Sequence, residues 1–309
     1  MRNAYIKAIY DLAKEDKNIL ALVADNGAIV FDQFRCDYPE QFINFGISEA
    51  NMVSAAAGLA NCGKIPFAYT IAGFITMRAF EQVRNDVCLQ KQNVKLVGVG
   101  AGMRYSAQGP THHATEDIAI MRVLPSMNII VPASPREAYA ATRWAAQING
   151  PVYIRLEATN EPEIYEEDYE FQLGKGVILK DGGDITLVAA GSIIHDVLTA
   201  ANKLMEKGIH ARVINMPSIK PIDKDIIIEA AQETGKIITI EEHNVIGGLG
   251  STVAEVLLEN RCSVIAFKPM GLQDCFGKGY GSHAYIKTKN GLSPEQIIEN
   301  CLKMIGTLY

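Results

Sequence analysis

The sequence predicts an α/β protein of two domains, each built on a mainly parallel β-sheet with helices on both faces. First, apolar runs of strand length alternate with helical patterns along most of the chain. Second, this alternation is interrupted over residues 157–176, where the sequence is acidic, contains Pro162 and shows no sustained period. Third, 309 residues are enough for two domains of ordinary size. We therefore expect domains at residues 1–160 and 175–309.

The first domain begins with an amphipathic helix over residues 1–18, and the alternation follows. Its predicted strands are apolar throughout, which is typical of a parallel sheet covered on both faces. These strands lie at residues 18–24, 42–45, 65–70, 94–100, 128–133 and 151–156. The patterns between them predict helices at residues 48–62, 76–91, 114–123 and 135–149.

The second domain shows the same alternation. Its predicted strands lie at residues 184–192, 211–216, 236–242 and 263–268, and its helices at residues 194–207, 223–234, 250–259 and 294–305. Two glycine clusters invite comparison with phosphate-binding loops. The cluster at 181–184 precedes a strand and does not open a helix, so we interpret it as a turn. The cluster at 247–252 does open a helix, but close backbone packing explains it as well.

Composition excludes several classes of function. The formal net charge is −6 and no basic stripe is present, which argues against nucleic-acid binding. No apolar run is long enough to span a bilayer, and charges interrupt the N-terminal segment, so no membrane anchor or signal peptide is expected. Six scattered cysteines without a CxxC pair are typical of reduced thiols in a cytoplasmic protein. We expect no metal site, because the adjacent His112 and His113 should point apart.

One predicted helix contains an acid that its composition does not explain. The stretch "FGISEANMVSAAAGLANCG", residues 45–63, is apolar and rich in alanine, and Ser48 is placed to cap the helix. Glu49 nevertheless stands in the first turn. A carboxylate there can interact with the helix dipole, which contributes about 0.3 to 1 kcal/mol. Alternatively, an acid in apolar surroundings can take part in chemistry. The residues alone leave both interpretations open.

Two further connections offer reactive or aromatic side chains. Phe74 and Arg78 follow the third predicted strand, and His112 lies in the loop "SAQGPTHHATED" after the fourth. The carboxyl ends of parallel strands share one edge of the sheet, where ligands bind in such folds. We therefore expect Glu49, an aromatic ring and a histidine at the same edge.

These stretches carry a family resemblance. The first domain resembles the pyrimidine-binding domain of transketolase-like enzymes in the order and spacing of "FGISEANMVSAAAGLA", "GFITMRAFEQVRNDV", "GPTHHATEDIAIMRVLP" and "MNIIVPASPREA". The second is similar to the family's C-terminal domain in "AGSIIHDVLTAANKL", "INMPSIKPID" and "EEHNVIGGLGSTVAEVL". The resemblance therefore covers essentially the whole chain. It is strongest to the C-terminal subunit of split transketolases, with 1-deoxyxylulose-phosphate synthase and the β chain of 2-oxo-acid dehydrogenases more distant.

The resemblance implies cofactor contacts for four residues. Glu49 matches the glutamate that hydrogen-bonds N1′ of the aminopyrimidine of thiamine diphosphate, where a protonated carboxyl favours the imino tautomer that takes the proton from C2. Phe74 matches the ring that stacks on the aminopyrimidine, with Ile75 as the alternative if the alignment slips by one residue. Arg78 and Asp25 match positions near the cofactor, although an exposed helix position and a turn would also explain them.

The resemblance also implies substrate contacts. His112 matches the histidine that contacts the substrate near the reacting carbonyl. Arg155 matches a position that binds substrate phosphate, although a surface arginine at a strand end is the alternative. Arg104 and Tyr105 are further candidates for holding a phosphate.

Three positions depart from the sugar-using transketolases. Those enzymes carry "GEDGxTHQ" where this chain has "SAQGPTHH", so Gln108 replaces an aspartate and Ala107 replaces a glutamate. Gly100 replaces a histidine at the end of the preceding strand. A glutamine can still hydrogen-bond a hydroxyl group, but without a charge. Substrate recognition is therefore expected to differ from that of ordinary transketolases.

The implied activity is thiamine-diphosphate-dependent transfer of a two-carbon ketol unit between sugar or sugar-phosphate substrates. The chain lacks the "GDG…N" motif with which the family's N-terminal domain binds Mg²⁺ and diphosphate, so a separate N-terminal subunit is expected to supply it. We expect an α2β2 assembly, homodimerisation through both domains, and no activity from this chain alone. Two alternatives stay open, namely acyl transfer from a 2-oxo acid and a non-catalytic regulatory role.

Overall fold

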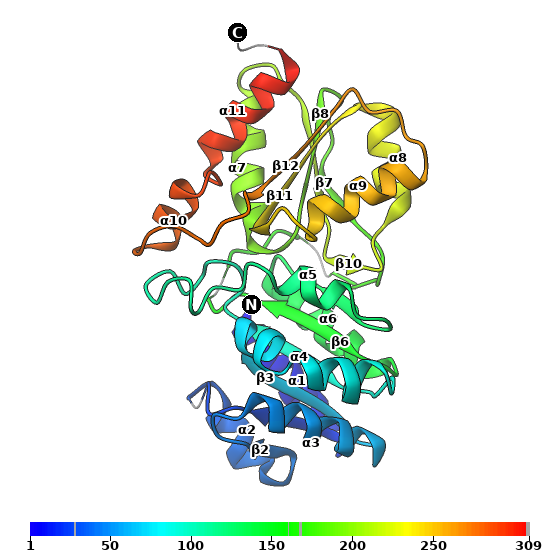
Figure 1. Cartoon of the computed structure of the whole chain (residues 1–309), viewed down its shortest axis with the longest axis vertical. Helices are drawn as coiled ribbons and strands as arrows, with labels where there is room; N and C mark the ends of the chain where they lie inside the picture. Colours follow the sequence, from blue (N-terminus) through cyan, green and yellow to red (C-terminus); the bar gives the residue numbers. More distant parts are fainter. Residues whose placement is uncertain (28, 160, 167–168, 307–309) are drawn as a thin grey trace. The chain divides into compact units, whose positions relative to one another are not determined.

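The computed structural model describes residues 1–27, 29–159, 161–166 and 169–306, and the chain divides into two compact units (Figure 1). The first unit contains Met1–Ala101 and Ile120–Gln172, and the second contains Gly102–Ala119 and Leu173–Tyr309. Position 160, the expected end of the first domain, lies outside the described residues. The segment Gly102–Ala119, here named the 102–119 loop, therefore packs with the second unit although it lies inside the first expected domain.

A parallel sheet forms the centre of the first unit. Its strands follow the order β5-β6-β4-β3-β1-β2, and each pair of neighbours is parallel. The strands β1, β4 and β6 are buried along their whole length, as their unbroken apolar sequences predict. The bounds are β1 (Ile19–Val23), β2 (Phe42–Asn44), β3 (Ile65–Ile71), β4 (Lys95–Val99), β5 (Asn128–Ile130) and β6 (Val152–Leu156).

The predicted helices of the first unit are present except after β3. There the expected helix at 76–91 is replaced by a short α-helix between two π-helical segments, η3 and η4. π-Helical turns are rare and occur frequently at functional sites. The bounds are α1 (Arg2–Glu15), η1 (Ile29–Phe31), α2 (Asp32–Asp37), η2 (Pro39–Gln41), α3 (Glu49–Asn61), η3 (Phe74–Arg78), α4 (Phe80–Gln82), η4 (Val83–Cys88), α5 (Asp117–Arg122) and α6 (Pro135–Gln147).

The second unit is built on a five-stranded sheet of order β12-β11-β8-β9-β7. All its pairs are parallel except β7 with β9, which is antiparallel. Figure 1 shows α7 and α11 on one face of this sheet and α8 and α9 on the other. The bounds are β7 (Val177–Lys180), β8 (Ile185–Ala189), η5 (Gly191–Ile193), α7 (Ile194–Met205), β9 (Ala211–Asn215), β10 (Ser218–Lys220), α8 (Lys224–Glu233), β11 (Lys236–Asn244), α9 (Leu249–Glu259), β12 (Ala266–Leu272), α10 (His283–Lys289) and α11 (Pro294–Ile305).

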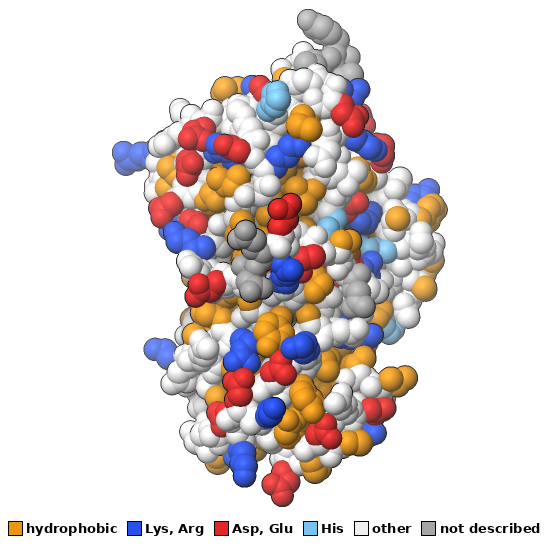
Figure 2. Space-filling view, turned by 180° about the vertical axis from the view of Figure 1, so that it is seen from behind, with side chains coloured by type: hydrophobic (Ala, Val, Ile, Leu, Met, Phe, Trp, Pro, Cys, Tyr) orange, Lys and Arg blue, Asp and Glu red, His pale blue; other side chains and the backbone are white. Residues whose placement is uncertain are grey.

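These two sheets confirm the predicted α/β class with mainly parallel strands. The sequence patterns did not predict β7, β10, α2 or α10, which are short or lie at an edge. Acidic and basic side chains are intermixed on the face drawn in Figure 2. In the described part of the chain, no helix is both long enough and apolar enough to cross a bilayer.

Candidate active site

Glu49 is the first residue of α3 and is buried, with 5% of its side chain exposed. Ser48 precedes it at the N-cap position, but its hydroxyl donates a 2.7 Å hydrogen bond to the carbonyl of Phe45 and makes no side-chain cap to the helix. The expected side-chain cap is therefore wrong. Because no side chain caps the start of α3, the Glu49 carboxylate is the acidic group in its first turn, where the helix dipole favours a negative charge.

Glu49 is joined to Phe74 through Arg78. The guanidinium carbon of Arg78 lies 3.7 Å from the centroid of the Phe74 ring, a cation–π contact. Its Nη1 donates to Glu49, at 3.3 Å from Oε1 and 3.5 Å from Oε2. The three side chains therefore form one cluster, here named the Glu49 cluster, in which a flat cationic group covers an aromatic face and reaches a buried carboxylate.

The backbone after β3 leaves the side chain of Phe74 more exposed than that of Ile75. The segment η3 begins at Phe74, and Ile75 is fully buried while Phe74 is only half-buried. This turn approaches β4 closely at Gly98, where an added Cβ would lie 2.9 Å from the Cα of Ala72. The alternative assignment of the stacking role to Ile75 is thus disfavoured, because a fully buried side chain has no face available.

Asp25 occupies the turn after β1 in the left-handed region, with φ of 53°. Aspartate tolerates this conformation better than most residues. Its backbone N–H donates to Oδ1 of Asn44 at 3.1 Å, and Nδ2 of Asn44 donates to Oδ1 of Asp25 at 3.2 Å. The turn interpretation therefore describes its local structure, and the described contacts leave its carboxylate exposed.

Two predicted substrate residues lie on or directly after the middle strands of the first sheet. Arg155 on β6 pairs in register with Gly98 on β4 and is only 4% exposed, so the alternative of a surface arginine is wrong. Gly100 follows β4 with φ of 79°, a left-handed conformation that strains any residue with a side chain. The backbone conformation at this position therefore favours glycine, which stands where the family has a histidine.

The 102–119 loop carries Gln108 and His112 in the second unit. Gln108 is exposed, and its backbone N–H donates to the carbonyl of Tyr105 at 3.0 Å. His112 is half-buried, with Thr111 Oγ1 at 3.0 Å from its Nδ1 and the ring of Tyr105 edge-on at 6.3 Å. The loop closes on itself, because Ala114 N–H donates to the carbonyl of Gly102 at 2.8 Å.

A group of residues that the sequence did not point to holds the start of this loop. The carboxylate of Glu242, at the end of β11, accepts the backbone N–H of Met103 at 3.2 Å and lies 2.8 Å from Nε2 of His283. Arg104 Nη1 lies 2.7 Å from Nδ1 of His283. Arg104, a candidate for phosphate binding, is thus directed at His283. No local pattern marks these partners, since 139 residues separate Met103 from Glu242.

Two titratable groups, one beside the loop and one within it, have shifted pKa values. Burial alone would raise the pKa of Glu242, but His283, Lys287 and the N–H of Met103 outweigh it and hold the pKa at about 2. Burial lowers the pKa of His113, which Glu242 raises and the neighbouring histidines lower further. Among the described residues, neither ring nitrogen of His113 has a hydrogen-bond partner. Both shifts favour a charged Glu242 and a neutral His113.

The His113 shift predicts a loss of stability in mild acid. Because the unfolded chain binds this proton near the ordinary histidine value and the folded chain resists it, the free energy of unfolding should fall as the pH drops below about 6.5 and level off above it. Urea unfolding of the wild type and of His113→Gln at pH 7.5 and pH 5.5 measures this. The variant should lose less stability between the two values. Equal losses would show that His113 does not contribute.

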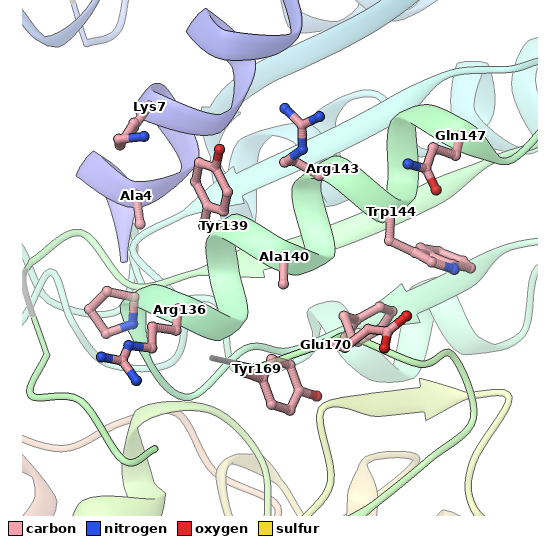
Figure 3. A pocket seen from close by; sticks show the side chains of 12 residues that line it. Ala4, Lys7, Arg136, Tyr139, Ala140, Arg143, Trp144, Gln147, Tyr169 and Glu170 are labelled. Carbon is pink, nitrogen blue, oxygen red and sulfur yellow. The ribbon is translucent and has the colours of Figure 1, made fainter. Parts of the chain in front are cut away.

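A cavity of about 900 Å³ lies elsewhere in the first unit, beside α1 and α6 (Figure 3). It contains none of the predicted site residues. Its three cations already have acidic partners, since Lys7 lies 2.9 Å from Asp11, Arg143 lies 2.9 Å from Glu15 and Arg136 lies 4.0 Å from Glu163. As far as the described residues show, this cavity therefore offers no unbalanced positive charge to an anionic ligand.

Comparisons with known proteins identify the family of both domains. The family model described as transketolase, pyrimidine binding domain, matches residues 1–162, and that described as transketolase, C-terminal domain, matches residues 174–297. A solved structure of a split gene transketolase, described as an inactive β4 tetramer, is similar with a TM-score of 0.89 and 42% identity. That similarity covers 99% of this chain and 97% of that one.

Two curated relatives are similar over almost their full length. An apulose-4-phosphate transketolase subunit from Phocaeicola vulgatus is 39% identical, covering 98% of this chain and 97% of that protein. A 6-deoxy-6-sulfo-D-fructose transketolase subunit from a Clostridium species is 39% identical, covering 96% and 92%. The chain belongs to the transketolase family. Within that family it is the C-terminal subunit of a split, transketolase-like transferase.

Membership of this family implies dependence on thiamine diphosphate, and the Glu49 cluster fits that group. The guanidinium of Arg78 is flat and carries N–H donors, and it makes two contacts at once, stacking on Phe74 and hydrogen-bonding Glu49. A flat aminopyrimidine ring has the same two requirements, an apolar face and a carboxyl partner for a ring nitrogen. Once Arg78 has moved aside, the Phe74 face and the Glu49 carboxyl group therefore suit the ring.

Proposed function

We propose that this chain acts in an α2β2 transketolase that transfers a two-carbon ketol unit between sugar substrates. The observation that carries the proposal is the Glu49 cluster, in which a buried carboxylate and an aromatic face are bridged by a flat cationic group. We assign cofactor binding to Glu49, Phe74, Arg78 and Asp25, and substrate binding to His112, Gln108, Arg155 and the strand end at Gly100. We also propose that the chain works as two domains, residues 1–160 and 175–309.

Four of these residues have a definite task in this proposal. When bound, thiamine diphosphate supplies the nucleophilic carbon that carries the two-carbon unit. Glu49 holds a proton between its carboxyl and a nitrogen of the aminopyrimidine ring, and Phe74 supports one face of the ring. The half-exposed Arg78 gives up that face, which its long side chain allows. His112 donates a hydrogen bond to a substrate oxygen beside the reacting carbonyl.

The proposed partner is a separate N-terminal chain that carries the "GDG…N" motif and holds Mg²⁺ and the diphosphate. The sequence supports this because the motif is missing from the chain. The similar split gene transketolase supports it as well, since its tetramer of β chains alone is described as inactive. A regulatory role without catalysis is less well supported, because Glu49 and His112 both keep the residue types that the chemistry needs.

The proposed substrate is a sugar other than the common pentose phosphates. The two curated relatives are named for apulose 4-phosphate and for 6-deoxy-6-sulfo-D-fructose. Gln108 and Gly100 stand where ordinary transketolases carry an acid and a histidine, so the recognition of hydroxyl and phosphate groups has to differ. These departures and the relatives' names together favour a modified sugar as donor or acceptor.

The test is reconstitution. Co-expression with an N-terminal chain carrying "GDG…N", ideally one encoded beside this gene, should give an assembly that uses thiamine diphosphate. A screen of ketose donors, modified ketoses and 2-oxo acids then identifies the donor. Turnover with a ketose supports the proposal, turnover only with a 2-oxo acid would replace it by acyl transfer, and an inactive but stable assembly would favour a regulatory role.

A prediction about specificity follows from Gln108. Gln108→Asp should raise kcat/KM of the assembled enzyme for ordinary sugar phosphates about 5- to 10-fold, since a charge-assisted hydrogen bond to a hydroxyl group exceeds a neutral one by about 1 kcal/mol. Gln108→Asn is the matched control, because it has the size of aspartate without the charge. A double change with Gly100→His is unsuitable, because the positive φ of Gly100 would strain it. Efficient use of pentose phosphates by the wild type would contradict this prediction.

A further inference from the structure

The 102–119 loop is bound to its own unit at both ends. Near its end, the carbonyl of Thr115 accepts the N–H of Asn244 at 2.7 Å, and the N–H of Ala119 donates to Nε2 of His243 at 3.3 Å. A separate set of contacts holds its beginning. Met103 and Arg104 meet Glu242 and His283, and the next contact follows at once, where Ser106 Oγ donates to the carbonyl of Gly281 at 2.7 Å. Gly109 packs directly under Tyr280, since an added Cβ would lie 2.2 Å from the ring. The first half of the loop therefore rests on β11 and on the segment that leads into α10.

The hydrogen bonds among Arg104, His283 and Glu242 form a chain in which each donor and acceptor can be assigned. Arginine only donates, so Nδ1 of His283 accepts a hydrogen bond from Arg104, and the N–H at Nε2 donates one to Glu242. Glu242 Oε2 thus accepts two hydrogen bonds, from His283 and from the backbone N–H of Met103. Glu242 is only 4% exposed, so a missing donor would leave a buried carboxylate poorly partnered. Each member of the set thus fixes the orientation of the next.

We propose that Glu242 and His283 are positioning residues that, with Arg104, clasp the start of the 102–119 loop and so set where Gln108 and His112 are presented. What Gln108 and His112 recognise rests on the proposed function. The contacts that form the clasp do not depend on it. The C-terminal domain would then take part in substrate recognition, because two of its residues position the loop. Glu242 and His283 touch the loop and not the reacting atoms.

The first experiment measures the clasp without any reaction. Hydrogen–deuterium exchange of the full chain, followed by mass spectrometry, should show amides in peptides over residues 102–113 exchanging about tenfold faster in Glu242→Ala and in His283→Ala, because local opening no longer breaks this network. Peptides of α3 and η3 in the first unit should be unchanged. Unchanged exchange over 102–113 would overturn the proposal.

The matched control is the neighbouring acid. Glu241 is equally buried and accepts two backbone N–H groups, from Leu249 at 2.7 Å and Gly250 at 2.8 Å, at the start of α9. Glu241→Ala should loosen peptides of α9 and leave residues 102–113 protected. If Glu241→Ala loosens the loop as much as Glu242→Ala does, the effect is general destabilisation and the clasp is refuted.

The second experiment uses the reconstituted assembly. Glu242→Ala should raise the KM of the substrate about tenfold with a much smaller change in kcat and in the Kd of thiamine diphosphate, and Glu242→Gln should restore most of the loss because its amide oxygen can still accept both N–H groups. Equal losses in kcat and cofactor affinity would refute a positioning role. A wild-type assembly without ketol transfer would instead refute the proposed function, and the exchange experiment would still decide the clasp.

Discussion

Glu49→Gln is expected to lower the turnover of the assembled enzyme by about 10² to 10⁴, the usual range for a positioned proton-transfer group. Glutamine keeps the shape of the side chain at the start of α3 and can still hydrogen-bond a ring nitrogen, but it cannot hold the proton that the carboxyl would share with the ring. The loss should therefore appear in kcat, with assembly intact. Steady-state kinetics and C2–H/D exchange of the bound cofactor, which should slow in parallel, measure it.

A matched control is available in α6. Glu137 is also a buried acid in the first turn of a helix, where it accepts the N–H of Ala133 at 2.6 Å and the hydroxyl of Tyr165 at 2.7 Å. Glu137→Gln should cost stability without slowing C2 exchange. If Glu49→Gln leaves the exchange rate at the wild-type value, Glu49 serves only as a partner of the helix dipole.

The isolated chain is expected to have no transferase activity and to bind thiamine diphosphate more weakly than micromolar, whereas addition of the N-terminal chain should bring both to full strength. The physical reason is that the diphosphate carries most of the cofactor's charge, and the groups that hold it and Mg²⁺ are assigned to the other chain. The ring alone has only the Glu49 cluster to bind, and there it has to displace Arg78 from Phe74.

Calorimetry of the isolated chain and of the reconstituted mixture, with Mg²⁺ present in both, checks this expectation. Analytical ultracentrifugation of the same samples reports whether the mixture forms the α2β2 assembly. Micromolar binding of thiamine diphosphate to the chain by itself would contradict the split-enzyme proposal. Full binding only in the mixture, with the stoichiometry of one cofactor per pair of chains, would support it.

Local sequence determined most of the secondary structure and the family. The unbroken apolar runs of β1, β4 and β6 predicted parallel strands buried on both faces, because only covered sheets tolerate such sequences. The motif around Glu49 predicted the helix that became α3 and, through the family resemblance, its role. These features depend on residues a few positions apart, so they can be predicted from the local pattern of apolar and polar residues.

The tertiary structure alone decided the features that depend on distant partners. It showed that Arg78 bridges Glu49 and Phe74 across 29 residues, that Arg155 is buried, and that Gly100 needs a left-handed backbone. It also placed the 102–119 loop with the second unit, where Glu242 and His283 hold it. A hydrogen bond between Met103 and Glu242 spans 139 residues, and no local pattern of residue types encodes which buried acid will accept which backbone N–H.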